Sequence, residues 1–213
     1  MKRLLVIGAG GHAKVIVDIL QQNMEYEVVG LIDQPGTEGF WNIPVIGSDE
    51  DLPRLRAEIG VKYAFVALGN GRLREKVTDK VIAAGYTLIS VISKHAVISK
   101  SVCLGVGTAI MPGAVVNADV VIGKGCIINT NASLDHEDVV GDYTHIAPGC
   151  ALSGKVTVGK QCLLGTGCRV IDGISIGDNS TIGAGTVVIK AIAGNCTAVG
   201  VPARVIKREQ NIF

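Results

Sequence analysis

The chain has 213 residues, a formal net charge of +1, 48% hydrophobic and 18% charged residues. It contains no long run of like charge, which argues against a nucleic acid or a membrane surface as a partner. No segment approaches the roughly 20 apolar residues of a membrane span, and the short apolar run near the N-terminus lacks a signal-peptide cleavage site. The six cysteines show no metal-type spacing, so we expect a reducing, cytoplasmic setting and no bound metal.

Residues 1–93 alternate short aliphatic runs with amphipathic segments, which predicts a small parallel α/β domain of Rossmann-like type. The expected strands cover 3–7, 27–33, 62–69 and 87–92, the expected helices cover 14–22 and 72–84, and a Gly- and Pro-containing loop is expected over 34–48.

The first expected turn carries the pattern Gly8-x-Gly10-x-x-Ala13, and Asp33 closes the second expected strand. These are features of a dinucleotide site, in which glycines allow close approach of phosphate and the acid binds a ribose. The motif is short, however, and about 90 residues are too few for a full dinucleotide-binding fold.

From Ala96 to Ala191 the sequence divides without a gap into sixteen hexads, such as VVIGKG and CLLGTG. Because strand side chains alternate, the first and third positions of each hexad point to the same side. The first position is usually small, the third is always aliphatic, and Gly, Asn and Asp near the end suit corners. The third-position residues are Ile98, Leu104, Ile110, Val116, Ile122, Ile128, Leu134, Val140, Ile146, Leu152, Val158, Leu164, Val170, Ile176, Ile182 and Val188.

The first position also explains most of the cysteines, which we expect to be small inward-facing core residues. Cys103 and Cys196 lie off this column and have no assigned role. Asp138 also stands at an inward position, where a carboxylate without a partner would be costly. The cysteines in the column are Cys126, Cys150, Cys162 and Cys168.

The hexad array resembles the hexapeptide-repeat acyltransferases. This resemblance implies a left-handed parallel β-helix over 96–191 with three hexads per coil, although ordinary handedness rules for parallel strands would predict the reverse. It further implies acetyl-CoA as co-substrate and a homotrimer with active sites between subunits. The segment VGVPARVIK at 199–207 resembles the family's ending, so the tail 192–213 is expected to complete the CoA site.

The whole chain resembles one branch of that family, the sialic acid O-acetyltransferase and bacillosamine N-acetyltransferase type. The motifs that carry this resemblance are VIGAGGHAK at 6–14 and LGN at 68–70. It implies that the N-terminal domain binds a nucleotide-sugar acceptor. Phosphate contacts are expected from Gly10, Gly11 and His12, and sugar–base contacts from Asp33, Gly69 and Asn70.

His136 occupies the fifth position of the hexad ASLDHE, beside Asp135, Glu137 and Asp138. Taken alone, a corner histidine beside acids is more often a solvated surface residue than a catalytic one. Neighbouring carboxylates can nevertheless raise the basicity of an imidazole and fix its tautomer, as a general base requires. The resemblance implies that His136 is the general base and Glu137 its partner.

The resemblance also implies contacts with acetyl-CoA. His145, at an outward second position, is expected to touch this co-substrate. Backbone groups around Thr166 and Ala184 are expected to line its path. Because His136 and His145 are one and a half hexads apart, they are expected on different parts of the coil perimeter.

Three other functions remain open at this point. The leading hypothesis is N-acetylation of a nucleotide-linked amino sugar. The first alternative, O-acetylation of a sialic acid or another sugar, needs the same base and the same β-helix. A zinc-dependent carbonic anhydrase is disfavoured because the repeat holds only two histidines, His136 and His145. A non-catalytic trimeric scaffold is disfavoured by His136 and Glu137 at the catalytic segment.

Overall fold

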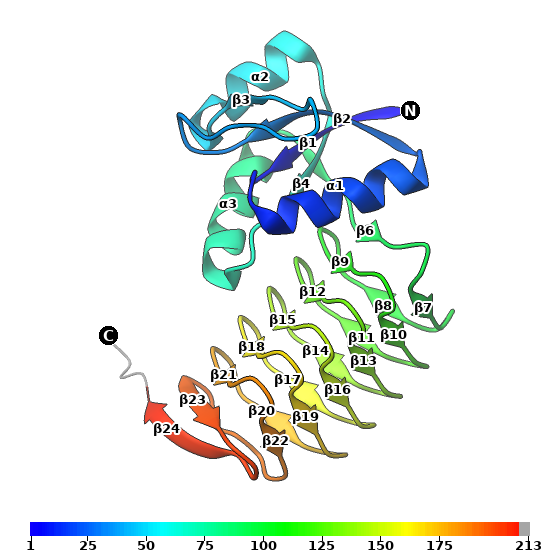
Figure 1. The fold of residues 1–213 in the computed structure, drawn as a ribbon, viewed down its shortest axis with the longest axis vertical. Helices are drawn as coiled ribbons and strands as arrows, with labels where there is room; N and C mark the ends of the chain where they lie inside the picture. The colour runs from blue at the N-terminus through cyan, green and yellow to red at the C-terminus, as the bar shows by residue number, and fades with distance from the viewer. Residues whose placement is uncertain (209–213) are drawn as a thin grey trace. The chain divides into compact units, whose positions relative to one another are not determined.

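The computed structural model describes residues 1–208, which form two compact units divided between Lys94 and His95 (Figure 1). Residues 209–213, the end of the expected tail 192–213, lie outside the described part. Among residues 1–208, no helix is both long and apolar enough to cross a membrane.

The N-terminal unit contains a five-stranded parallel sheet with the order β3-β2-β1-β4-β5. Its central strand β1 ends in four consecutive buried residues, 4–7, as expected for a strand covered on both faces. The strands are β1 (Lys2–Ile7), β2 (Tyr26–Ile32), β3 (Val45–Gly47), β4 (Tyr63–Val66) and β5 (Thr87–Leu88). The helices are α1 (Gly11–Asn23), the 3₁₀ turn η1 (Asp49–Asp51), α2 (Leu52–Ile59) and α3 (Gly71–Ala83).

This unit differs from the sequence expectation at three places. The segment expected as a loop over 34–48 ends in β3, and η1 and α2 follow it where no element was expected. Ser48 starts η1 with a capping box, in which the Asp51 carboxylate accepts from the Ser48 backbone N–H at 2.9 Å. The strand expected over 87–92 is divided, because β5 ends at Leu88 and β6 (Val91–Ile92) is not part of this sheet.

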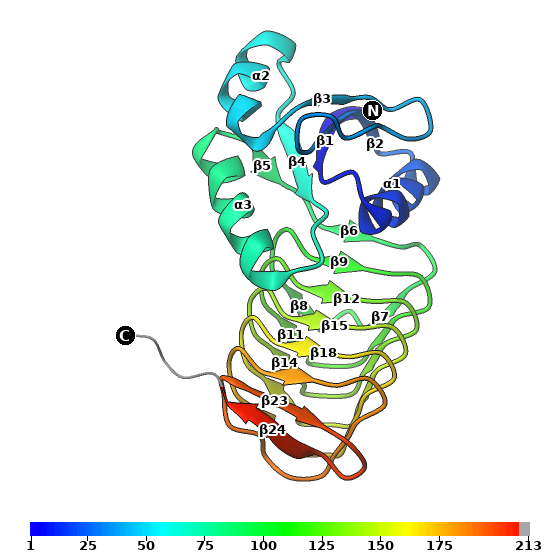
Figure 2. The same ribbon diagram turned by 60° about the vertical axis from the view of Figure 1, so that its left-hand side comes forward.

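The second unit is a left-handed β-helix made of two-residue strands on three faces (Figures 1 and 2). The first face contains β7 (Val97–Ile98), β10 (Val115–Val116), β13 (Ser133–Leu134), β16 (Ala151–Leu152), β19 (Arg169–Val170) and β22 (Val187–Val188). The second contains β8 (Cys103–Leu104), β11 (Val121–Ile122), β14 (Val139–Val140), β17 (Thr157–Val158) and β20 (Ser175–Ile176). The third contains β9 (Ala109–Ile110), β12 (Ile127–Ile128), β15 (His145–Ile146), β18 (Leu163–Leu164), β21 (Thr181–Ile182), β23 (Cys196–Val199) and β24 (Arg204–Arg208).

Strand pairing fixes the length of one coil. Val115 of β10 pairs with Val97 on one side and with Ser133 on the other, each eighteen residues away. Three hexads therefore make one coil, as the family resemblance implied. The tail closes the third face, where β23 pairs in parallel with β21 and β24 returns antiparallel to β23.

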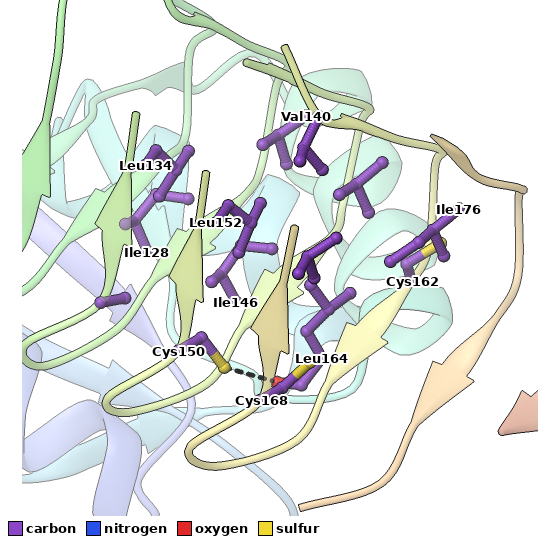
Figure 3. Packing of buried hydrophobic residues seen from close by; sticks show 14 of the residues in the cluster. Ile128, Leu134, Val140, Ile146, Cys150, Leu152, Cys162, Leu164, Cys168 and Ile176 are labelled. Carbon is purple, nitrogen blue, oxygen red and sulfur yellow. Dashed lines mark hydrogen bonds between the residues drawn. The ribbon is translucent and has the colours of Figure 1, made fainter. Parts of the chain in front are cut away.

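Third-position aliphatic side chains fill the interior of the β-helix (Figure 3). From Ile110 to Val188 all of them are buried. The four first-position cysteines are also buried and form no disulfide, which confirms their expected core role. The thiols of Cys126, Cys150 and Cys162 donate to backbone carbonyls of the next coil, as Cys126 Sγ does to Gly141 O at 3.2 Å. Cys196 is buried too, whereas Cys103 is exposed.

The corners have a fixed backbone conformation. From 107 to 185, every sixth residue has a positive φ, and this position includes Glu137 at +62°. Close stacking of coils adds a second constraint at the fourth position. A Cβ at Gly141 would lie 2.6 Å from the backbone N of Lys160 on the next coil, so only glycine fits there.

Two adjacent valines on β14 test the inward and outward assignment. Val140 is 1% exposed and Val139 is 39% exposed. We expect Val140→Ala to reduce the free energy of unfolding by about 2 kcal/mol through lost burial and a cavity. Val139→Ala should change it by less than about 0.5 kcal/mol. Urea unfolding followed by circular dichroism measures both, and equal losses would contradict the assignment.

Candidate active site

His136 lies on the corner between β13 and β14 and reaches solvent. Its side chain is 54% exposed, and that of Glu137 is 51% exposed. His136 Nδ1 lies 3.0 Å from Glu137 Oε2, and Lys155 Nζ lies 3.7 Å from the same oxygen. An exposed contact of this kind contributes little to stability, but it restricts the orientation of the imidazole.

The contact with Glu137 decides which imidazole nitrogen is basic. An ionised carboxylate can only accept hydrogen bonds, so His136 Nδ1 carries the proton and donates a hydrogen bond to Glu137 Oε2. His136 Nε2 then presents a lone pair. This nitrogen can accept a proton from a group bound at the corner.

Gly154 lies one coil after His136 and supports the imidazole. A Cβ at Gly154 would lie 2.5 Å from His136 Nε2 and closer still to Cε1. The ring therefore rests against the glycine backbone of the next coil. Nothing in the sequence marks this residue except its position eighteen residues after His136.

The turn that carries His136 is held by several hydrogen bonds. Asp135 Oδ1 accepts from the His136 N–H at 2.8 Å and from Asn117 Nδ2 at 3.0 Å. These two bonds lower the pKa of Asp135 below its usual range. The Glu137 N–H donates to Ala118 O at 3.0 Å.

Asp138 is fully buried directly below this turn. Its carboxylate accepts two backbone hydrogen bonds, from Asp135 N at 3.0 Å and from Val156 N at 2.8 Å. Burial raises the pKa of Asp138 to about 7, while the two N–H donors act in the opposite direction. The inward carboxylate thus has the partners that its position requires.

The residues expected to contact acetyl-CoA lie elsewhere on the coil perimeter. His145 is a half-buried residue of β15 on the third face, and its Nε2 lies 3.0 Å from Asn129 Nδ2. Thr166 and Ala184 occupy the next corner on successive coils, where the Gly185 N–H donates to Thr166 O at 2.8 Å. Asn129 was not expected from the sequence as a neighbour of His145.

In the N-terminal unit, the expected acceptor-binding residues follow the carboxyl ends of three neighbouring strands. Gly10, Gly11 and His12 follow β1, Asp33 follows β2, and Gly69 and Asn70 follow β4. The chain leaves β1 toward β2 on one side and β4 lies on the other. Such a switch point is where parallel α/β sheets bind ligands.

Backbone hydrogen bonds organise this edge of the sheet. Asp33 Oδ2 accepts from the Ala9 N–H at 2.6 Å, and Oδ1 accepts from the Gln34 N–H at 2.7 Å. Asn70 caps α3, because its Oδ1 accepts from the Leu73 N–H at 3.0 Å. Gly10 is the N-cap of α1, whose first turn contains no acidic residue. The start of α1 is therefore suited to an anion.

Arg74 is a buried residue of this edge that the sequence did not indicate. It is 1% exposed, and its Nη1 donates to Leu68 O at 2.7 Å and to Gly69 O at 2.9 Å. These bonds fix the turn after β4. This arginine lies within the helix expected over 72–84, and no role was expected for it.

His12 is electrically neutral near pH 7. Burial, and secondarily the nearby Arg74 charge, lower the pKa of His12 to about 4. Its Nε2 is buried and has no hydrogen-bond partner among the described residues. A ligand at this edge would meet a hydrogen-bonding imidazole and not a positive charge.

A cavity of about 190 Å³ opens at the same edge, lined by residues that include Gly8, Asp33, Asp49 and Leu68. Gly8 has a φ of +115°, and a Cβ there would lie 2.8 Å from Ala67 O. Asp49 was not expected from the sequence as a site residue. Within residues 1–208, no cluster of three or more His, Cys, Asp or Glu side chains could hold a metal ion.

Comparison with known families and sequences divides the chain as its structure does. Residues 3–81 match the PglD N-terminal domain, and residues 155–190 match the hexapeptide repeat of succinyl-transferase. A UDP-N-acetylbacillosamine N-acetyltransferase of Bacillus subtilis (strain 168) is 35% identical over 117 residues. That alignment spans 52% of this chain and 52% of the relative, so it covers about half of each protein.

Solved structures match over nearly the whole chain. PerB from Caulobacter crescentus, in complex with CoA and GDP-perosamine, is 41% identical with a TM-score of 0.92, covering 97% of this chain and 98% of that one. The acetyltransferase domain of PglB from Neisseria gonorrhoeae FA1090, in complex with acetyl coenzyme A, is 34% identical with a TM-score of 0.90, covering 96% and 99%. On this evidence the chain belongs to the hexapeptide-repeat acetyltransferases that carry a PglD N-terminal domain.

Proposed function

We propose that this enzyme transfers the acetyl group of acetyl-CoA to the amine of a nucleotide-linked amino sugar. The observation that carries the proposal is the His136–Glu137 pair, which leaves Nε2 of a half-exposed imidazole as a base on a β-helix corner. The similarity to a GDP-perosamine complex over nearly the full chain supports an amine acceptor over the hydroxyl of a sialic acid.

In the proposed mechanism the sugar amine attacks the thioester carbonyl of acetyl-CoA. The new C–N bond forms, and His136 Nε2 takes the proton that the nitrogen must lose. The C–S bond then breaks, and the leaving CoA thiolate takes up the proton from the His136 imidazolium, which restores the base. The Glu137 carboxylate stabilises the imidazolium that exists between these steps. Transfer is direct, with no acyl-enzyme.

We assign the acceptor's nucleotide to the carboxyl edge of the N-terminal sheet. The start of α1 at Gly10 and Gly11 suits the diphosphate, and neutral His12 supplies a hydrogen bond to it. Asp33 lines the cavity at this edge, and Gly69 and Asn70 follow the neighbouring strand β4. We assign these three residues to the ribose, sugar and base.

We propose a homotrimer with the active sites between subunits. In one chain, His136 lies on the corner between the first and second faces. His145 lies on the third face, and Thr166 and Ala184 lie on the corner that follows it. If the last three bind acetyl-CoA, a neighbouring chain must bring its His136 to them. Free cysteines and the use of acetyl-CoA support a cytoplasmic location.

An acceptor panel tests the proposed reaction. The protein would be incubated with acetyl-CoA and UDP-, dTDP- and GDP-linked 4-amino sugars, with free sialic acid as the alternative acceptor. We expect CoA release with one nucleotide amino sugar and none with sialic acid. Turnover with sialic acid alone would move the function to O-acetylation, and a protein that fails to bind acetyl-CoA would be a scaffold.

Removing the proposed base should abolish transfer. We expect His136→Ala to lower kcat by about 10²- to 10⁴-fold, the usual contribution of a general base, without changing the melting temperature. His95→Ala provides the matched control, because His95 is an exposed histidine outside the proposed site. A fully active His136→Ala enzyme would rule out the base assignment.

Gly154 should be required for the position of the proposed base. Its φ is not in the left-handed range, so the obstacle to alanine is the His136 ring and not the backbone. We expect Gly154→Ala to lower kcat by about 100-fold, because a displacement of about 1 Å has effects of this size. In a double-mutant cycle, the same change in the His136→Ala background should have no further effect on kcat. Additive losses would show that Gly154 acts independently of His136.

A further inference from the structure

The backbone bonding between coils changes at the corner that carries His136. Along the β-helix, the fourth-position N–H donates to the third-position carbonyl of the next coil, as Asn117 N does to Leu134 O at 3.0 Å. Ser153 N continues the pattern to Val170 O at 3.0 Å. The N–H of Asp135, in the same position one coil before Ser153, instead donates to Asp138 Oδ2 at 3.0 Å.

The other carboxylate oxygen of Asp138, Oδ1, accepts a backbone hydrogen bond that a threonine hydroxyl accepts on other coils. Asp138 Oδ1 accepts from the N–H of Val156, eighteen residues later, at 2.8 Å. Thr108 and Thr144 make the equivalent bonds, each accepting from the N–H eighteen residues later at 3.0 Å through Oγ1. The bond to Val156 is thus one that the hydroxyls of Thr108 and Thr144 also make, whereas the bond to Asp135 requires the other carboxylate oxygen, Oδ2.

Asp135 connects the Asp138 carboxylate to the backbone of His136. Asp135 Oδ1 accepts from the His136 N–H, and the next coil holds His136 O through the Lys155 N–H at 2.9 Å. The turn is therefore fixed on one side by the next coil and on the other by Asp138. Losing the Asp138 bond frees Asp135 to return to the regular ladder, and the His136 backbone would rotate with it.

We propose that Asp138 is a positioning residue, whose buried carboxylate holds the turn 135–137 out of the regular ladder and so sets the orientation of His136. This inference rests on the proposed role of His136 as the base. Asp138 itself is fully buried and does not touch a substrate.

The carboxylate has to be ionised to perform this role. Protonation would place an O–H against one of the two N–H donors and break one bond. The charged groups that act on Asp138 are Asp135 and His136 of its own turn, and the neighbouring coils present Val120 and Val156 at the equivalent inward positions. Because burial raises the pKa of Asp138 to about 7, the turn is released as pH falls through that value.

Asp138→Thr separates the two bonds. Threonine keeps the acceptor for Val156 N, as at Thr108 and Thr144, and loses the one for Asp135 N. We expect kcat to fall by about 100-fold, with acetyl-CoA affinity unchanged by calorimetry. The acid limb of the kcat–pH profile should lose one ionisation near pH 7. A carboxyl group whose pKa is raised in the folded protein lowers its stability at pH values above that pKa. The melting temperature of Asp138→Thr at pH 8 should therefore equal or exceed that of the wild type.

A second pair of variants controls for the chemistry of the substitution. Asp138→Asn turns an amide N–H toward one of the two backbone N–H donors and should also lower kcat. Asp178→Asn makes the same change where a corner carboxylate accepts from Lys160 N at 2.9 Å, and it should leave kcat unchanged. Equal losses in both would mean that any carboxylate change in the coils disturbs the enzyme.

Two further results would overturn the inference. One is a fully active Asp138→Thr enzyme with the wild-type pH profile. The other is a fall in kcat matched by lower melting temperature and weaker acetyl-CoA binding, which would indicate a purely structural role. His136→Ala, measured in parallel, separates this inference from the proposed function. If His136→Ala is inactive while Asp138→Thr is normal, the base assignment stands and only the positioning role of Asp138 fails.

Discussion

The stacking of coils through backbone hydrogen bonds is the constraint on which the β-helix depends. Each coil takes its register from the one before it, with paired residues eighteen positions apart. Parallel strands lie about 4.8 Å apart, so there is room at the inward and corner positions only for certain side chains. Small first positions, aliphatic third positions and a glycine at close approaches such as Gly141 all follow from this spacing.

Much of this unit could be predicted from sequence because the same constraint acts on every coil. A pattern repeated sixteen times identifies inward positions even where a single hexad would be ambiguous. The N-terminal unit lacks such repetition, and there the expectation was weaker. It missed β3 and α2, and it extended a strand past Leu88. The capping box at Ser48 was a usable signal for the start of η1 and α2.

The candidate site was only partly visible in the sequence. Its chemical groups, His136 and Glu137, are adjacent in the chain, so their contact follows from local structure. The residues that orient them come from other coils, as Gly154 and Asn117 do, and only the eighteen-residue register brings them together. The neutrality of His12 could not be predicted either, because it depends on burial and on a buried arginine from another helix.

The uniform coil also acts as a measure of length along the axis. His136 and Thr166 belong to different coils, so the number of coils between them sets how far apart the two corners lie along the axis in each chain. Inserting or deleting one complete coil would preserve every inward and outward position while shifting this distance by about 4.8 Å. With His136 as the proposed base and Thr166 as a proposed acetyl-CoA contact, a full-coil change between these corners would leave folding intact and impair the proposed reaction. Beyond them, the same change would alter only the length of the molecule.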